Sequence, residues 1–166
     1  WWQWKWPIYW PPSTTQTQQN KELSMKTARR RAREFVVQGL YQAQLNSALT
    51  ASNIRSNLLD NEQFLKADEP LFAQVFDGAF ETQTELLQLI TPHLDRDLAE
   101  VSPIERAVLL MATFELREMP ETPYPVIINE AIEITKTFGG TDGFKFVNGI
   151  LDKIAPQLRP NDPPRK

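Results

Sequence analysis

A basic strip near the beginning of the chain is the clearest chemical signal in this sequence. Five cationic side chains fall within residues 25–33, and they are Lys26, Arg29, Arg30, Arg31 and Arg33. A guanidinium group suits phosphate because its fork donates two hydrogen bonds in one plane. The strip therefore predicts an anion-binding site.

The residues around this strip predict a helix over Ala28–Leu45. At 100° per residue, one broad face collects the apolar and small residues that must be buried, namely Ala32, Phe35, Val36, Gly39, Leu40 and Ala43. The opposite face, which we expect to be an exposed ridge, carries Arg30, Arg33, Val37 and Tyr41. Because an aromatic ring beside guanidinium groups can stack on an unpaired base, the pattern indicates a site for single-stranded RNA. The alternative is a solvated arginine face with Tyr41 at the edge of the core.

The distribution of charge supports a localised site. Residues 1–24 carry +1 and residues 25–33 carry +5, so residues 34–166 must carry −9 to give the net charge of −3. An acidic body with one basic strip is typical of a local binding surface and not of a uniformly basic coat.

Composition excludes several other classes of site. The chain has no cysteine, so a disulfide framework, a thiolate zinc site and a cysteine nucleophile are excluded. His93 is the single histidine and has no obvious partner, so we interpret it as structural. We expect no catalytic residue, no metal and no cofactor. No apolar run approaches the roughly 18 residues of a membrane helix, so we expect a cytoplasmic protein with no membrane partner.

The first 24 residues differ in composition from the rest. All five tryptophans lie there, followed by a proline pair and a polar stretch, without helical or strand periodicity. We interpret residues 1–24 as a disordered extension, such as a mis-assigned start, and the alternative is a segment that binds a membrane interface. The predicted domain spans residues 25–158, and residues 159–166 are expected to form a flexible tail.

Capping signals and apolar repeats predict helices throughout this domain. After the first helix we expect a short helix to about Leu59, a long core helix from Asp68 to near Thr91, a helix from the capping box Ser102–Glu105, a helix after Tyr124 that Gly139 stops, and a last helix from Thr141 or Asp142 that ends before Pro156. No alternating strand pattern competes with them. The fold class is therefore all-α, with six or seven helices.

Several segments, in order, resemble the NusB family of bacterial antitermination factors. They are Met25–Glu34 with Gln38–Tyr41, Ser102–Val108, Ile128–Glu133, and Lys136–Gly139 continued by Lys145–Lys153. The resemblance covers about residues 25–160, and it leaves the Trp-rich segment unmatched.

The resemblance implies both a fold and a role. The fold would be two small packed helical bundles. The protein would pair with NusE, a small-subunit ribosomal protein, and the heterodimer would bind single-stranded boxA RNA in nascent ribosomal transcripts. With NusA and NusG, it would modify RNA polymerase so that transcription reads through terminators, without catalysis or a cofactor. Some proteins of this kind form homodimers, and self-association that covers the arginine face would be inhibitory.

The resemblance also assigns residues to two surfaces. The RNA-binding surface would comprise the strip from Lys26 to Arg33, Tyr41 and four later residues, Phe138, Asp142, Lys145 and Phe146. Both phenylalanines also fit core positions, and Asp142 also fits a helix cap. The NusE-facing surface would include Glu105, with Arg106 and Glu115 as weaker candidates.

An enzymatic alternative remains, because related helical domains are fused to RNA cytosine methyltransferases. That activity requires a cofactor-binding domain and a catalytic cysteine, and this sequence contains neither. The alternative therefore holds only if the sequence is a fragment.

Overall fold

A computed structural model describes the backbone of residues 21–163 and the side chains from residue 27 onward. The α-helices are α1 (Lys21–Leu45), α2 (Ala51–Leu59), α3 (Glu69–Glu81), α4 (Gln83–Ile90), α5 (Pro103–Glu118), α6 (Tyr124–Phe138) and α7 (Gly143–Leu158). Three short 3₁₀ turns connect them, η1 (Glu62–Lys66), η2 (Thr91–His93) and η3 (Leu98–Glu100). This part of the chain contains no strand, and the predicted all-α class is confirmed.

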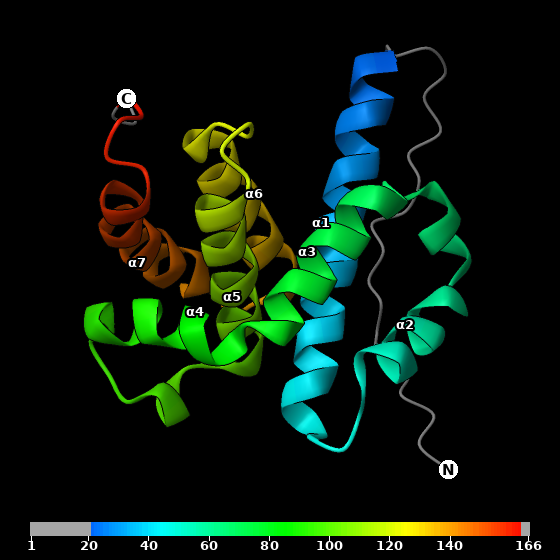
Figure 1. The fold of residues 1–166 in the computed structure, drawn as a ribbon, viewed down its shortest axis with the longest axis horizontal. Helices are drawn as coiled ribbons and strands as arrows, with labels where there is room; N and C mark the ends of the chain where they lie inside the picture. Colours follow the sequence, from blue (N-terminus) through cyan, green and yellow to red (C-terminus); the bar gives the residue numbers. More distant parts are fainter. Residues whose placement is uncertain (1–20, 164–166) are drawn as a thin grey trace.

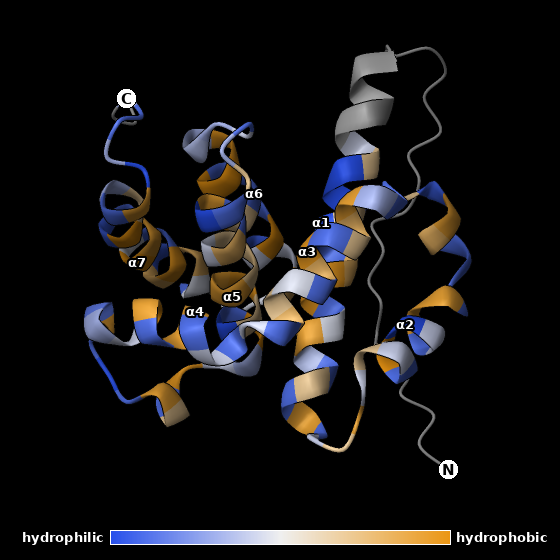
Figure 2. Cartoon of the chain, viewed as in Figure 1, coloured by the Kyte–Doolittle hydropathy of each residue, from blue (hydrophilic) through white to orange (hydrophobic). Residues whose placement is uncertain are grey.

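The helices form two groups, which correspond to the two small bundles that the family resemblance implies. Helices α1, α2 and α3 lie on one side of the molecule, and α4, α5, α6 and α7 lie on the other (Figure 1). The groups share one apolar core, because α5 contacts both α1 and α3 as well as α4, α6 and α7. Apolar residues recur along α5 and α7 (Figure 2). Every residue from Ala107 to Leu116 is buried, so α5 is enclosed on all sides.

Aromatic side chains fill the core of the first group. Phe64 in η1 packs edge-to-face against Phe35 of α1 and Phe72 of α3, with ring centroids 5.1 and 5.0 Å apart. The series continues along α3 through Phe76 and Phe80, at centroid distances of 5.3 and 5.8 Å. These separations fall in the favourable range for aromatic pairs, so the rings join α1, η1 and α3.

The prediction of one long core helix from Asp68 to near Thr91 is wrong. The helix is broken at Thr82, which has φ −111° and ψ 23° and lies between α3 and α4. The Thr82 hydroxyl donates a hydrogen bond to the Gly78 carbonyl at 2.6 Å. The two segments lie in different groups of helices, so the chain changes partners at this position (Figure 1).

The start of the first helix and the end of the last helix also differ from the sequence prediction. Helix α1 begins at Lys21, before the expected start at Ala28 and before the expected domain boundary at Met25. Helix α7 continues through Pro156 to Leu158. The Trp-rich residues 1–20 of the predicted extension and residues 164–166 of the predicted tail lie outside the described residues.

The chain after α7 is anchored where we expected a flexible tail. Arg159 is only 7% exposed, and its guanidinium donates to four main-chain carbonyls, those of Glu115, Leu116, Met119 and Thr122, at 2.6–3.2 Å. It also pairs with Asp162 at 2.9 Å. The last carbonyls of a helix lack partners within the helix, so Arg159 satisfies the end of α5 and fixes the chain beside it.

Among the described residues, no helix is both long and apolar enough to cross a membrane. The same residues contain no group of three or more His, Cys, Asp or Glu side chains that could hold a metal ion.

Candidate nucleic-acid interface

Arg29 is the arginine of the basic strip that is most available to an external anion. Its side chain is 61% exposed, and its Nε lies 3.9 Å from an Asp68 carboxylate oxygen. The other carboxylate oxygen of Asp68 caps α3 by accepting the Leu71 N–H at 3.1 Å. Arg29 is therefore held loosely by a carboxylate that already has a structural role.

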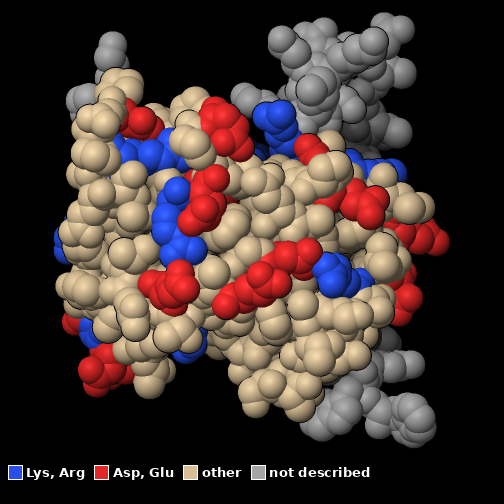
Figure 3. Space-filling model, in the orientation of Figure 1, with Lys and Arg blue, Asp and Glu red and all other residues tan. Residues whose placement is uncertain are grey.

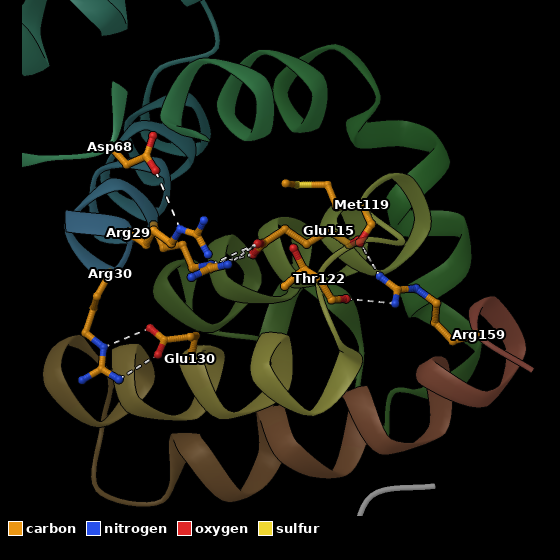
Figure 4. Close-up of polar contacts among 9 residues, drawn as sticks. Arg29, Arg30, Asp68, Glu115, Met119, Thr122, Glu130 and Arg159 are labelled. Carbon is orange, nitrogen blue, oxygen red and sulfur yellow. Dashed lines mark hydrogen bonds and ion pairs between the residues drawn. The ribbon is translucent and has the colours of Figure 1, made fainter. Parts of the chain in front are cut away.

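Arg30 is half-exposed and forms a two-point contact with α6. Its Nε and Nη2 donate to the two Glu130 carboxylate oxygens at 2.9 and 2.8 Å (Figure 4). The hydrogen bond to Glu130 raises the pKa of Arg30, so the guanidinium stays charged. With 43% of its side chain exposed, Arg30 still presents a donor edge to solvent, although Glu130 offsets part of its charge.

The expected exposed ridge of α1 is wrong at Arg33 and Val37. Arg33 is 4% exposed and Val37 1% exposed. Arg33 donates to the Glu115 carboxylate at 2.8, 3.0 and 3.2 Å, and Glu115 is fully buried. Helix α1 packs against both α3 and α5, so every residue from Ala32 to Leu40 is buried. Neither Arg33 nor Glu115 lies on a surface where it can contact RNA or a partner protein.

A second buried carboxylate, Glu34 of α1, lies beside the strip. Glu34 is 7% exposed, and burial raises its pKa to about 7. The positive charges of Arg30 and Arg31 oppose this shift, and the negative charge of Glu130 adds to it. The basic strip therefore lies next to carboxylates, Glu34 and Glu130, that are not part of residues 25–33 and offset some of their charge of +5.

The remaining predicted residues of α1 lie at the edges of this region. Arg31 and Tyr41 are both partly exposed, and each has contacts within the protein. The Lys26 side chain lies outside the described residues. The face of the molecule in Figure 3 shows small groups of Lys and Arg next to Asp and Glu, without one continuous basic area.

The predicted residues from the end of α6 and the start of α7 come together at one corner. Asp142 and Lys145 are exposed and form an ion pair at 3.3 Å. Asp142 takes the N-cap position of α7, as the cap interpretation expected, but its side chain makes no capping hydrogen bond. Phe138 and Phe146 are both partly buried and pack against the core, as their alternative interpretation expected.

Two residues at this corner were missed by the sequence analysis. Phe144 has the ammonium groups of Lys136 and Lys145 5.0 and 5.9 Å from its ring centroid. Arg96, in the connection between η2 and η3, places its guanidinium 4.4 Å from the centroid of the Phe146 ring. The sequence held one signal for Phe144. At 100° per residue, its side chain points about 70° away from the mean direction of the apolar stripe of α7, so it lies at the edge of that stripe.

The predicted partner-facing residues separate in the structure. Glu105 completes the expected capping box: its N–H donates to the Ser102 hydroxyl at 3.2 Å, and its carboxylate accepts the Ser102 N–H at 3.3 Å. Glu105 and Arg106 are partly exposed at the start of α5. Arg106 also has a buried Nε without a hydrogen-bond acceptor. Glu115, ten residues further along α5, lies in the core with Arg33.

Comparisons with known proteins show the family of this chain and its fold. The model of the NusB family matches residues 30–156. Transcription antitermination protein NusB of Neisseria gonorrhoeae is 58% identical over 142 residues, covering 86% of this chain and all of the relative. The protein of the same name from Chromobacterium violaceum is 60% identical over 135 residues, covering 81% of this chain and 91% of the relative.

Two solved structures share the fold. NusB of T. maritima matches with a TM-score of 0.67 and 32% identity over 81% of this chain and 92% of that one. A crystal structure of the antitermination factors NusB and NusE in complex with dsRNA matches with a TM-score of 0.70 over 80% of this chain and 99% of that one. Its identity of 19% supports the fold alone.

Proposed function

The chain belongs to the NusB family, and from this premise we propose that it binds boxA-type RNA of nascent ribosomal transcripts as a heterodimer with NusE. The family is one of non-catalytic transcription antitermination proteins. In the proposed role the heterodimer acts with NusA, NusG and RNA polymerase, so that transcription reads through terminators. Such a role places the protein in the cytoplasm, beside nascent RNA.

The observation that carries this proposal is the pair of available arginines on α1. Arg29 and Arg30 expose 61% and 43% of their side chains, on the helix that also carries the partly exposed Tyr41. Guanidinium groups bind phosphates and supply affinity without sequence choice. Selectivity then requires unstacked bases that meet Tyr41 and nearby polar groups. Arg31 and Lys26 extend the same strip along the chain.

The surface that begins at Arg29 and Arg30 extends along α6 to the exposed residues at the start of α7. Arg30 contacts Glu130, and Glu133, one turn further along α6, interacts electrostatically with Arg30. Glu133 in turn lies 3.5 Å from the Lys136 ammonium. Lys145 adds a cation for phosphate, and Asp142 can accept a hydrogen bond from a base amino group. Phe138 and Phe146 lie beneath this corner, where they contact the core and can offer their outer edges to RNA.

The partner surface in this proposal centres on Glu105. The capping box fixes its carboxylate at the start of α5, so the charge is positioned in advance for a basic residue of NusE. Arg106 lies beside it. Glu115 contributes indirectly, by holding Arg33 and therefore α1 against α5.

The proposal predicts modest RNA affinity for the chain alone. Few cations are available at the surface, because Arg33 is buried and Arg30 forms an ion pair with Glu130. A partner that extends the surface would raise the affinity. A homodimer that covered α1 would lower it.

The test is a binding titration of the full chain with a boxA-like RNA, a scrambled strand and a duplex of the boxA sequence. It is run with and without NusE at two salt concentrations, with sedimentation measured at the same protein concentration. We expect the single boxA strand to bind most tightly, NusE to increase binding, and salt to weaken it. Equal, weak binding to all three RNAs regardless of NusE would refute the proposal.

Arg29→Ala tests the surface itself. The loss of one phosphate contact should weaken binding and reduce the salt dependence by about one phosphate equivalent. Arg55→Ala is the matched control, since Arg55 is 41% exposed but pairs with Asp77 between α2 and α3. If the two variants bind boxA RNA equally well, Arg29 does not contact phosphate.

A further inference from the structure

Phe144 is an aromatic residue on the first turn of α7 whose ring does not pack against the core. The partly buried hydrophobic residues in contact with the core include Phe138 and Phe146 but not Phe144. Its ring is partly exposed, and its neighbours are two ammonium groups from different helices, Lys136 of α6 and Lys145 of α7. Both ammonium groups lie within the range of about 6 Å for cation–π attraction.

The neighbouring ring of Phe146 is held more closely. The Arg96 guanidinium lies 4.4 Å from its centroid, nearer than either ammonium group lies to Phe144, and the Phe146 ring also packs against the core. At 100° per residue, Phe144 and Phe146 point about 200° apart around α7, so they flank its apolar stripe on opposite sides. Of the three phenylalanines at this corner, Phe144 is therefore the one best placed to receive an external planar group.

The Phe144 ring also adjoins the surface that starts at Arg30. Lys136 connects the two, because its ammonium lies 3.5 Å from Glu133, which interacts with Arg30. The two carboxylates between them are paired, Glu130 with Arg30 and Glu133 with Lys136, so a strand of RNA that contacts the arginines of α1 can continue past α6 to this corner. A ring flanked by cations suits such a strand, since each nucleotide offers a stacking base and a negative phosphate.

We propose that Phe144 is a stacking platform for one unpaired base, and that Lys136 and Lys145 bind the phosphates on either side of that base. This inference rests on the proposed function, since it assigns a base contact within the same RNA surface. It also assigns the stacking role to a residue other than Phe138 and Phe146.

The experiment uses the full chain and boxA-like RNAs that carry 2-aminopurine at one position at a time. Stacking on an aromatic ring quenches 2-aminopurine, so the parent protein should quench one position strongly. Phe144→Ala should abolish that quenching and weaken binding about fivefold or more. Phe144→Trp should retain both, whereas Phe144→Leu, which keeps apolar bulk without a ring, should behave like Phe144→Ala.

Two controls separate a loss of stacking from a loss of structure. Because Phe144 is partly buried but lies outside the core cluster, Phe144→Ala should remain folded at the assay temperature and should lower the melting temperature less than Phe146→Ala does. Leu65→Ala removes another exposed apolar side chain, 88% exposed in η1, and should leave binding unchanged. Lys136→Ala should reduce the salt dependence of binding.

The outcomes distinguish the two proposals. If the parent and Arg29→Ala differ in RNA affinity but Phe144→Ala binds and quenches like the parent, the stacking platform is refuted and the proposed function stands. If the parent fails to distinguish boxA RNA from the scrambled strand, the proposed function fails, and this inference fails with it.

Discussion

An Arg33→Met variant would leave the Glu115 carboxylate buried without its counter-ion. Glu115 is 0% exposed, and two Arg33 nitrogens donate to it at 2.8–3.2 Å. Removing one member of such a pair typically costs about 3–5 kcal/mol, because the remaining charge is buried and uncompensated. The free energy of unfolding of a domain this size is typically about 5–15 kcal/mol. We therefore expect Arg33→Met to lose a large fraction of its stability.

The double variant Arg33→Met/Glu115→Leu should recover most of this loss. Apolar side chains of similar volume are often as stable as a buried ion pair, because neither charge has to be desolvated. Each single variant should therefore lose more free energy of unfolding than the double variant does, by about 3–5 kcal/mol.

The pH dependence of Arg33→Met follows from Glu115. Burial raises the pKa of Glu115, and Arg33 opposes that shift, so the variant should raise the pKa further. A carboxyl group whose pKa is higher in the folded state destabilises the fold when it is ionised. The cost of the variant should therefore be largest above the folded pKa and should decrease as the pH falls toward the unfolded value.

The assay is urea unfolding followed by circular dichroism, at pH 8 and at pH 5.5. Arg29→Met is the matched control, because it removes an arginine from the same helix that is 61% exposed, and its effect should stay within about 0.5 kcal/mol. The reasoning is refuted if Arg33→Met costs less than about 1 kcal/mol, or if it lowers RNA affinity at unchanged stability.

Two further predictions concern stability at positions outside this ion pair. Glu34→Gln should be more stable than the parent by about 2–4 kcal/mol at pH 8, because the pKa of Glu34 is raised to about 7 in the folded state. In denaturation series of both proteins, this difference in stability should decline as the pH falls from 7 toward 4.5. Gly78→Ala should cost about 1–3 kcal/mol, because the added carbon would lie 2.2 Å from the Phe114 ring, whereas Gly149→Ala, with nothing within 4 Å, should gain about 0.5–1 kcal/mol. Equal melting temperatures for the two alanine variants would contradict this account.

The parts of the fold that depend on local chemistry could be predicted from the sequence. Asp68 and Ser102 cap α3 and α5 as their residue types indicated, and Gly139 ends α6. The break at Thr82 is marked by neither glycine nor proline, and although Thr82 and Glu85 have the spacing of a capping box, the Thr82 side chain makes no capping hydrogen bond. That break depends on the packing of α3 and α4 against different neighbours, which a single sequence does not reveal.

The error at Arg33 has a related cause. Periodicity assigns one buried face and one exposed face to a helix, and this holds for a helix that packs on one side. Helix α1 is buried on more than one side between Ala32 and Leu40. The partners of Arg30 and Arg33 lie 100 and 82 residues away, so no local pattern could show that these arginines are paired.

These pairings change what the basic strip implies for RNA binding. A count of five cations suggests five phosphate contacts, but Arg33 forms a buried ion pair with Glu115, and Glu130 offsets part of the charge of Arg30. For single strands, each phosphate contact contributes about 0.7 to the slope of log affinity against log salt. Arg29→Ala should therefore lower the slope by about 0.7. The double variant Arg33→Met/Glu115→Leu removes the Arg33 charge without leaving Glu115 unpaired, and it should leave the slope unchanged. If this double variant lowers the slope as much as Arg29→Ala, Arg33 contacts RNA and the buried pair must open on binding.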